Sequence, residues 1–441
     1  MKVIQRERGK ILFLIIFLFI PLGIWLGGEG QQFLFTNLYT SLTTIGKIAG
    51  IIGVGFFAGN MFLSGRYKVL DRLFHGLDRV YLFHRQTGIR AFVLLTIHLL
   101  ALTFRNLAFS FQAVIDFTTS FSNIPVLIGR VGYYGFLVLI IITLFVRMKY
   151  ERLKRLHQFM GVFLFFGGLH VYLIPSDVSV NMYLRWYILG IVALALISYS
   201  WRVLLRRWII QRTIADVIAV NKLGDTVIEV VMKPQKEKVN FIPGQFIFVK
   251  FKQPGFPYED HPFSLTASTE EPTLRISAKA LGDFTKKLPE LKPGAEAHIQ
   301  GPFGGFSFLK SENKKQIWIA GGIGITPFMS MARSLRDRVE KDPTLKEYDI
   351  TLFYSVKNEP EHIYAKELEE ISQKLPNFHF IPWVTDRDGF INAARVHQKI
   401  KVTDETIFIC GPKPMLNALR DQFQILGISR SRIHFELFKL L

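Results

Sequence analysis

The chain has 441 residues, which is enough for two or three domains. Its formal net charge of +19 at pH 7 would suit a nucleic-acid partner, but Lys and Arg gather beside long apolar stretches, so we expect a lipid bilayer and no nucleic acid. The single cysteine, Cys410, excludes an internal disulfide.

Six apolar stretches in the first half are each long enough to cross a bilayer, whose hydrocarbon core is about 30 Å thick. The predicted spans are Ile11–Gly27, Leu42–Leu63, Leu82–Phe104, Pro125–Val146, His157–Pro175 and Tyr183–Leu205. The composition becomes more polar near 201–212. We therefore expect an all-α bundle of six transmembrane helices over residues 1–212.

Basic residues predict an orientation for this bundle. The segments rich in Lys and Arg are 1–10, 66–85, 147–155 and 202–212, and the loops that hold almost none are 28–41, 106–123 and 176–182. Cytoplasmic loops carry the excess of basic residues, so we expect a multi-pass cell-membrane protein with both termini in the cytoplasm. A cleaved signal peptide is the alternative for the first span, but its apolar run is longer than a typical signal core.

Four histidines occupy matched positions on two of these spans. His84 and His98 are fourteen residues apart, and His157 and His170 are thirteen apart. An ionisable side chain inside a membrane is costly and usually functional, although a single histidine in an apolar helix is commonly a packing residue. Fourteen helical residues extend about 21 Å, most of the bilayer core. We expect His84 with His157, and His98 with His170, to ligate two b-type haems with no open iron position.

The thirteen-residue interval conflicts with a regular helix. At about 100° per residue, fourteen residues return to within about 40° of the starting face, whereas thirteen miss it by about 140°. We therefore expect the fifth span to be bent or irregular. Gly167 and Gly168, just before His170, are the predicted place of the distortion.

The second half alternates short apolar strands with polar turns. The predicted strands are 227–232, 246–251, 274–278, 350–354, 378–384 and 407–410, and the predicted helices are 328–341 and 365–375. The first three strands and their Pro-Gly turns predict a small antiparallel β-barrel over 213–312. The later alternation of strands and helices predicts a parallel, doubly wound α/β domain over 313–441.

Two segments of the predicted barrel suit a flavin dinucleotide. The segment His261-Pro262-Phe263-Ser264-Leu265-Thr266-Ala267-Ser268 combines hydroxyls and a histidine, and Gly282-Asp283-Phe284-Thr285 places a glycine and a threonine at a helix start. They resemble the flavin motif of the NADPH oxidase and ferric reductase branch of the ferredoxin reductase superfamily, and the resemblance covers nearly the whole chain. It implies a ferredoxin reductase-like module that binds FAD, with Ser264 at flavin N5 and His261 near the phosphates. A small hydroxyl at N5 leaves room for the nicotinamide.

The segment Ile317 to Pro327 predicts a buried strand, a glycine-rich turn and a helix start. Gly321, Gly322 and Gly324 would let the backbone approach phosphates closely, and the N-terminus of the helix favours negative charge. We expect a nicotinamide nucleotide to bind at this turn.

The resemblance implies roles for three further residues. Cys410, beside Gly411, would lie next to the nicotinamide, unless it is a buried structural cysteine. Lys357 stands where NADPH-using members carry an arginine for the 2′-phosphate, which favours NADPH while leaving NADH possible; an ordinary surface lysine is the alternative. Phe438 would cover the flavin ring, unless Phe435 or Phe438 is only the end of a last strand. The residues expected at FAD and the nucleotide are His261, Pro262, Phe263, Ser264, Thr266, Gly282, Phe284, Thr285, Gly321, Gly322, Gly324, Thr326, Pro327, Lys357, Cys410, Gly411 and Phe438.

The resemblance as a whole implies an enzyme that passes electrons from NADPH through FAD and two haems to O₂ outside the cell, giving superoxide. Lys47 stands where NADPH oxidases carry an arginine near the outer haem, and its charge would stabilise superoxide; a snorkelling lysine is the alternative. Leu102 departs from the animal members, which carry a second histidine there. An Fe(III) or Cu(II) reductase, or an electron donor to an extracytoplasmic partner protein, are the alternative functions. No regulatory module is visible, so we expect no obligatory regulatory partner.

Overall fold

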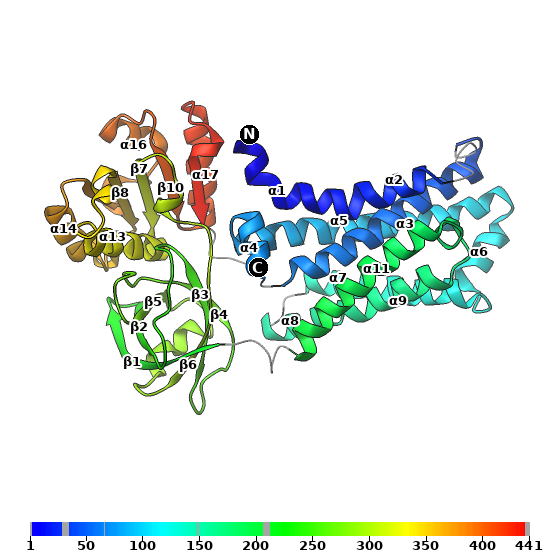
Figure 1. Cartoon of the computed structure of the whole chain (residues 1–441), viewed down its shortest axis with the longest axis horizontal. Helices are drawn as coiled ribbons and strands as arrows, with labels where there is room; N and C mark the ends of the chain where they lie inside the picture. Colours follow the sequence, from blue (N-terminus) through cyan, green and yellow to red (C-terminus); the bar gives the residue numbers. More distant parts are fainter. Residues whose placement is uncertain are drawn as a thin grey trace. The chain divides into compact units, whose positions relative to one another are not determined.

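The computed structural model describes residues 2–28, 35–65, 67–146, 148, 150–205 and 212–436. The chain forms two compact units, Met1–Phe74 with Arg79–Ile210, and His75–Asp78 with Gln211–Leu441. The first unit is helical, and the second contains two β-sheets and their covering helices (Figure 1).

Within the described residues, six helices of the first unit are long and apolar enough to cross a membrane, as predicted. These spans are Glu7–Leu26, Leu38–Leu63, Arg79–Ala108, Ile124–Phe145, Arg152–Leu173 and Met182–Val203. The α-helices of this unit are α1 (Lys2–Leu14), α2 (Ile20–Leu26), α3 (Leu38–Leu63), α4 (Lys68–Phe74), α5 (Leu77–Phe104), α6 (Phe111–Thr119), α7 (Ile124–Phe145), α8 (Tyr150–Gln158), α9 (Met160–Leu173), α10 (Asp177–Val180) and α11 (Met182–Ser200).

Helix α3 is the central helix of the bundle. In its apolar window 67% of the residues are buried, against 22–28% in the other five spans. Its N-cap, Asn37, accepts a hydrogen bond from the backbone N–H of Thr40 at 2.9 Å, which satisfies a donor that has no partner within the helix. A helix buried on most sides offers its backbone carbonyls to several neighbours, which bears on the candidate site.

The fifth span is irregular, as the thirteen-residue interval predicts. It is interrupted at Phe159, between α8, which carries His157, and α9, which carries His170. The predicted place of the distortion was wrong, because α9 continues through Gly167 and Gly168. Glycine lowers the stability of a helix but does not by itself break the ladder of hydrogen bonds.

The first sheet of the second unit is the predicted antiparallel barrel. Its strands are β1 (Thr213–Leu223), β2 (Val227–Pro234), β3 (Phe246–Lys252), β4 (His261–Ser264), β5 (Leu274–Lys279) and β6 (Glu296–Phe303). They lie in the order β4-β3-β6-β1-β2-β5. An antiparallel bridge between Leu265 and Ile276 joins the two ends of this order and closes the barrel around an apolar core.

The second sheet is parallel and doubly wound, also as predicted (Figure 1). Its strands are β7 (Lys315–Gly321), β8 (Asp349–Val356), β9 (Phe378–Val384), β10 (Thr406–Cys410) and β11 (Ile433–Glu436), in the order β11-β10-β7-β8-β9. Helices α13 (Thr326–Arg338) and α14 (Ala365–Lys374) contribute to one apolar cluster, and α16 (Ala393–Ile400) and α17 (Lys413–Ile425) contribute to another. The sheet therefore has a core on each face, and its carboxyl edge remains for a ligand.

Candidate functional site

The four histidines of the first unit meet in the two predicted pairs. The ring centroids of His84 and His157 are 6.1 Å apart, and those of His98 and His170 are 6.4 Å apart. An imidazole nitrogen lies about 2 Å from the metal ion that it binds, so two imidazoles on opposite sides of one iron have centroids about 6.3 Å apart. Both pairs have the spacing of axial ligands to a single metal ion.

The second ring nitrogen fixes the tautomer in three of the four histidines. The Nδ1 atoms of His84, His98 and His170 lie 3.1, 2.7 and 2.7 Å from the carbonyl oxygens of Asn60, Gly46 and Pro125. A carbonyl oxygen only accepts hydrogen bonds, so Nδ1 carries the proton and Nε2 keeps the lone pair that a metal needs. Sequence reasoning missed these three acceptors.

Two glycines allow helices to approach the histidines closely. A Cβ added at Gly50 of α3 would lie 2.6 Å from Nδ1 of His98, and one added at Gly129 of α7 would lie 2.7 Å from Nδ1 of His170. Each glycine is four residues after the carbonyl that accepts the hydrogen bond, and therefore one helical turn away on the same face. Any larger residue would push the imidazole away from its acceptor.

The donor set of each pair fits haem better than a free metal ion. No group of three or more His, Cys, Asp or Glu side chains that could hold a metal ion occurs in the part of the chain that the structure describes. Two imidazoles leave four of six positions on an iron to be filled, and a porphyrin supplies four nitrogens in one plane. The two pairs could thus hold one haem each.

Lys47, the residue predicted to act near the acceptor, forms an ion pair. Its Nζ lies 2.7 Å from Oδ1 of Asp177, and Nε1 of Trp25 donates to Oδ2 at 3.2 Å. Lys47 directly follows Gly46, whose carbonyl accepts from His98. Its charge is therefore compensated close to the His98–His170 pair, and an acceptor role for Lys47 stays a prediction.

The two predicted flavin segments are neighbours in the barrel. The ring of His261 on β4 stacks on Phe284, with centroids 3.7 Å apart and planes inclined by 28°. Ser264, at the end of β4, is buried and pairs with Phe246 of β3. The N–H of Gly282 donates to Oγ1 of Thr285 at 3.0 Å, so a side chain already engages one donor expected at the pyrophosphate. The contacts of Pro262, Phe263 and the other motif residues with FAD stay predictions.

Thr266 lies under the surface, where the barrel meets the parallel sheet. Its backbone carbonyl accepts a hydrogen bond from Nη1 of Arg333 on α13 at 2.8 Å. The same guanidinium binds both carboxylate oxygens of Glu367 on α14, at 2.7 and 2.6 Å, and lies 4.0 Å from Glu229 on β2. Tyr364 donates to Glu229 at 3.4 Å. This buried network, which sequence reasoning missed, joins the two sheets of the second unit.

Charge compensation holds Arg333 in this network. Burial lowers the pKa of its guanidinium, but the hydrogen bonds and charge of Glu367 outweigh burial, so the net shift is upward. A cation this deeply buried is stable only while its carboxylate partners remain.

The predicted nucleotide turns meet at the carboxyl edge of the parallel sheet. Strand β7 ends at Gly321, and the short 3₁₀ turn Gly322–Ile325 leads into α13, which begins at Thr326 and Pro327. Gly322 has φ +54°, a left-handed conformation that glycine adopts without strain. A Cβ at Gly324 would overlap the carbonyl of Cys410, and a Cβ at Gly411 would lie 3.1 Å from Cα of Gly321. The two turns therefore pack backbone against backbone, as close binding of a phosphate requires.

The structure also describes three residues that the sequence analysis considered for the nucleotide or flavin site: Cys410, Lys357 and Phe435. Cys410 is fully buried, and burial followed by the charge of Glu436 raises the pKa of its thiol well above the ordinary value. Lys357 is exposed directly after β8, and its carbonyl accepts from the N–H of Asp386 at 3.0 Å. Phe435 lies in β11 opposite Ile409, so it is part of a last strand. Phe438 lies outside the described residues.

Sequence reasoning missed a second cation near Lys357. Arg387, beside Asp386, is exposed and lies 3.0 Å from Asp388 and 3.6 Å from Glu359. Its charge is thus shared with two carboxylates. In the part of the chain that the structure describes, no ion pair involves Lys357, which makes Lys357 the better candidate for a phosphate.

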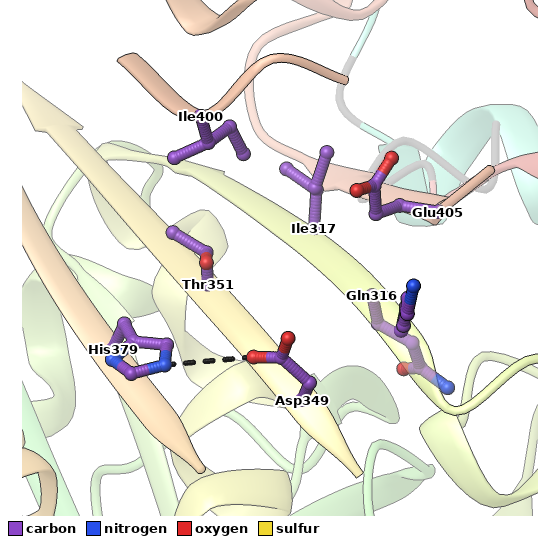
Figure 2. Close-up of a pocket in the computed structure, with 8 residues that line it drawn as sticks. Gln316, Ile317, Asp349, Thr351, His379, Ile400 and Glu405 are labelled. Carbon is purple, nitrogen blue, oxygen red and sulfur yellow. Dashed lines mark ion pairs between the residues drawn. The ribbon is translucent and has the colours of Figure 1, made fainter. Parts of the chain in front are cut away.

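A hollow of about 290 Å³ lies at the opposite edge of the same sheet. Figure 2 shows Asp349 and His379 in its wall, with Nε2 of His379 3.5 Å from Oδ1 of Asp349. Six of its eight residues come from the beginnings of β7, β8 and β9, and the other two are Ile400 and Glu405. Ligands of open α/β sheets bind outside the carboxyl ends of the strands, so this hollow is not the nucleotide site.

Three family models match the chain one after another. A ferric reductase like transmembrane component matches residues 49–168, an FAD-binding domain matches 212–315, and an oxidoreductase NAD-binding domain matches 318–421. The chain is therefore a membrane flavoprotein oxidoreductase that uses a nicotinamide nucleotide. It has the domain architecture of the NADPH oxidase and ferric reductase superfamily.

Individual relatives share only part of the chain. The flavohemoprotein of Rhodopirellula baltica is 28% identical over 232 residues, 47% of this chain and 55% of the relative. The glycine betaine monooxygenase reductase subunit of Pseudomonas aeruginosa is 31% identical over 214 residues, 45% of this chain and 56% of the relative. The chain thus spans a little over half the length of these relatives. The solved structure of the Amycolatopsis cytochrome P450 reductase GcoB has a TM-score of 0.45 and 22% identity, over 52% of this chain and 70% of that chain.

Proposed function

We propose that the protein is a transmembrane NADPH oxidase that reduces O₂ to superoxide with electrons from NADPH, through FAD and two b-type haems. The observation that carries this proposal is the pair of facing histidine pairs, with centroids 6.1 and 6.4 Å apart, in one chain with an FAD- and NAD-binding unit. When bound, the flavin would accept a hydride from the nicotinamide and release single electrons to the haem irons.

The chain's own backbone orients three of the four imidazoles. The carbonyls of Gly46, Asn60 and Pro125 hold the imidazoles with Nε2 toward the partner ring. A haem held between two imidazoles would have no free iron position, so it would supply transfer of single electrons and not binding of O₂ at iron.

We propose that electrons move from the cytoplasmic side of the membrane to the outer side. The basic segments at 1–10, 66–85, 147–155 and 202–212 favour cytoplasmic termini. They also favour a cytoplasmic position for the second unit, called the reductase unit below. His84 and His157 would then form the inner haem site, and His98 and His170 the outer one. We infer no regulatory partner, so activity would require only the nucleotide, FAD, haem and an acceptor.

The test is an anaerobic NADPH titration of the purified, haem-loaded protein, followed by air. We expect the flavin absorbance to bleach, two haems to be reduced, and reoxidation in air with dismutase-sensitive reduction of cytochrome c. His98→Leu should lose one haem and the superoxide signal, whereas His397→Ala, an exposed histidine of α16, should keep both.

The same experiment separates the alternative acceptors. Faster turnover with a ferric chelate than with O₂ would replace the oxidase by a metalloreductase. Full haem reduction with negligible transfer to any free acceptor would instead support an electron donor to a partner protein. A protein that binds FAD but no haem would contradict all three functions.

A further inference from the structure

Backbone carbonyls of α3 form a matched pair of acceptors for the histidines of α5. The carbonyl of Gly46 accepts from His98, and that of Asn60 from His84. Gly46 and Asn60 are fourteen residues apart, as are His84 and His98. Equal intervals on two helices allow the same hydrogen bond at both sites.

On the other side of the bundle the intervals differ by one residue. The carbonyl of Pro125 on α7 accepts from His170, and the residue fourteen positions later on α7 is Leu139. His157 is only thirteen residues from His170 and precedes the interruption at Phe159. The structure shows no hydrogen bond from His157 to the Leu139 carbonyl among the described residues, and instead places Nδ1 of His157 3.4 Å from Oγ1 of Thr143.

The Thr143 hydroxyl connects His157 to that carbonyl. Its Oγ1 donates to the carbonyl oxygen of Leu139 at 2.7 Å. A hydroxyl has one hydrogen, and a carbonyl oxygen has none to give, so the hydrogen of Thr143 lies toward Leu139. Only lone pairs of Oγ1 therefore face His157, and Nδ1 of His157 must be the donor.

We propose that Thr143 is the positioning residue of His157. Because of the thirteen-residue interval, His157 cannot reach a backbone carbonyl, and the hydroxyl of Thr143 serves as its acceptor instead. This inference rests on the proposed haem function. The hydrogen bond fixes the tautomer of His157 with Nε2 toward His84, as the three carbonyls do for the other ligands.

The proposal makes His157 the most weakly supported of the four ligands. Its contact of 3.4 Å is longer than the 2.7, 3.1 and 2.7 Å of the others, and its acceptor is a hydroxyl. A weaker bond from Nδ1 makes an imidazole a poorer electron donor, which stabilises ferric iron less. The weaker hydrogen bond of His157 therefore favours a higher midpoint potential for the haem at His84 and His157 than for the other haem.

Thr143→Val tests this inference in the full-length, haem-loaded protein, without turnover. Valine keeps the shape and removes the hydroxyl. In an anaerobic redox titration followed by absorbance, we expect one haem to shift to a higher potential and the other to remain unchanged. We also expect haem transfer to apomyoglobin to be faster by about 10-fold or more for one haem only, the usual scale for lost support of a ligand.

Two further variants separate the hydroxyl from packing. Thr143→Ser keeps the hydroxyl and should titrate as wild type. Thr43→Val is the matched control, because Oγ1 of Thr43 also donates at 2.7 Å to the carbonyl four residues earlier, on α3. If Thr143→Val and wild type have the same two potentials and the same haem loss, or if Thr143→Ser shifts as far as Thr143→Val, the inference is wrong while the haem function stands. A wild-type protein without bis-histidine haem spectra would overturn the proposed function itself, and this inference with it.

Discussion

The two units hold their candidate sites by different means. In the first unit, Met1–Phe74 with Arg79–Ile210, called the membrane unit below, reactive side chains are held by backbone atoms of neighbouring helices. The carbonyl of Gly46, for example, holds His98. In the reductase unit, the backbone forms the site, since Gly324 and Gly411 are parts of turns that pack against each other. Side chains such as Arg333 then fix one sheet against the other. The difference explains which parts of each site are visible in the sequence.

Residues held by backbone carbonyls and residues held by side chains also respond differently to substitution. A carbonyl cannot be removed by substitution, so the membrane site is disturbed only through the space around each histidine or through Thr143. A guanidinium can be removed in one step, and doing so leaves buried carboxylates without their partner. The predictions below use this contrast.

The largest effect is expected for Arg333→Met. It removes the two hydrogen bonds that Glu367 accepts from Arg333, which leaves Glu367 the 3.5 Å pair with Arg336, and it takes from the buried Glu229 its cationic partner. Breaking a buried ion pair from one side costs about 3–5 kcal/mol. We expect the reductase unit of the full chain to release FAD at a clearly lower temperature, measured by the rise of flavin fluorescence on heating.

Lys341→Met is the matched control for Arg333. Lys341 also joins the two sheets of the reductase unit, through a 2.7 Å pair with Glu270, but its side chain is 70% exposed. An exposed pair contributes about 0–1 kcal/mol. If both variants release FAD at the same temperature, the buried network does not hold the sheets together.

A smaller effect, confined to the membrane unit, is expected for Gly129→Ala. The added Cβ would lie 2.7 Å from Nδ1 of His170, so the imidazole must move away from the carbonyl of Pro125. Loss of such support typically lowers metal affinity by about 10- to 100-fold. We expect about one haem per chain in place of two, measured by the pyridine haemochrome assay, with FAD content unchanged.

Gly190→Ala shows whether the effect belongs to the histidine. Gly190 also lies in a membrane helix, α11, where it is exposed, and a Cβ there meets nothing within 4 Å. Two haems in Gly190→Ala and one in Gly129→Ala are the expected result. Two haems in both would show that close approach at Gly129 is not needed.

The sequence predicts most of the fold because periodicity is a local property. The strands at 227–232, 246–251 and 378–384 agree with β2, β3 and β9 to within two residues. Strand β6 was not predicted, because Gly301 and Pro302 lie inside it and indicate a turn. Strand β1 was not predicted either. Both are recognisable only from their pairing with each other and with their neighbours.

In the membrane unit, the sequence shows the four candidate haem ligands but not the carbonyl groups that orient them. His84, His98, His157 and His170 stand out because histidine is rare in apolar helices. Every residue has a carbonyl, so the acceptors of Gly46, Asn60 and Pro125 carry no signal of their own. Only the equal interval of fourteen residues between Gly46 and Asn60 could have indicated them. Arg333 resembles any arginine of a polar helix until the fold buries it.

The smallest effect is expected for Lys357→Ala, which tests the side-chain part of the nucleotide site. Lys357 is exposed after β8, at the carboxyl edge, and Arg387 beside it is paired with Asp388 and Glu359. If Lys357 binds the 2′-phosphate, kcat/KM for NADPH should fall by about 10-fold, or about 1.4 kcal/mol, while kcat/KM for NADH stays the same. Lys315→Ala, at the opposite edge of the sheet, should change neither. Equal losses for both nucleotides would place Lys357 at a part of the ligand that NADPH and NADH share, and the preference for NADPH would then have to come from Arg387.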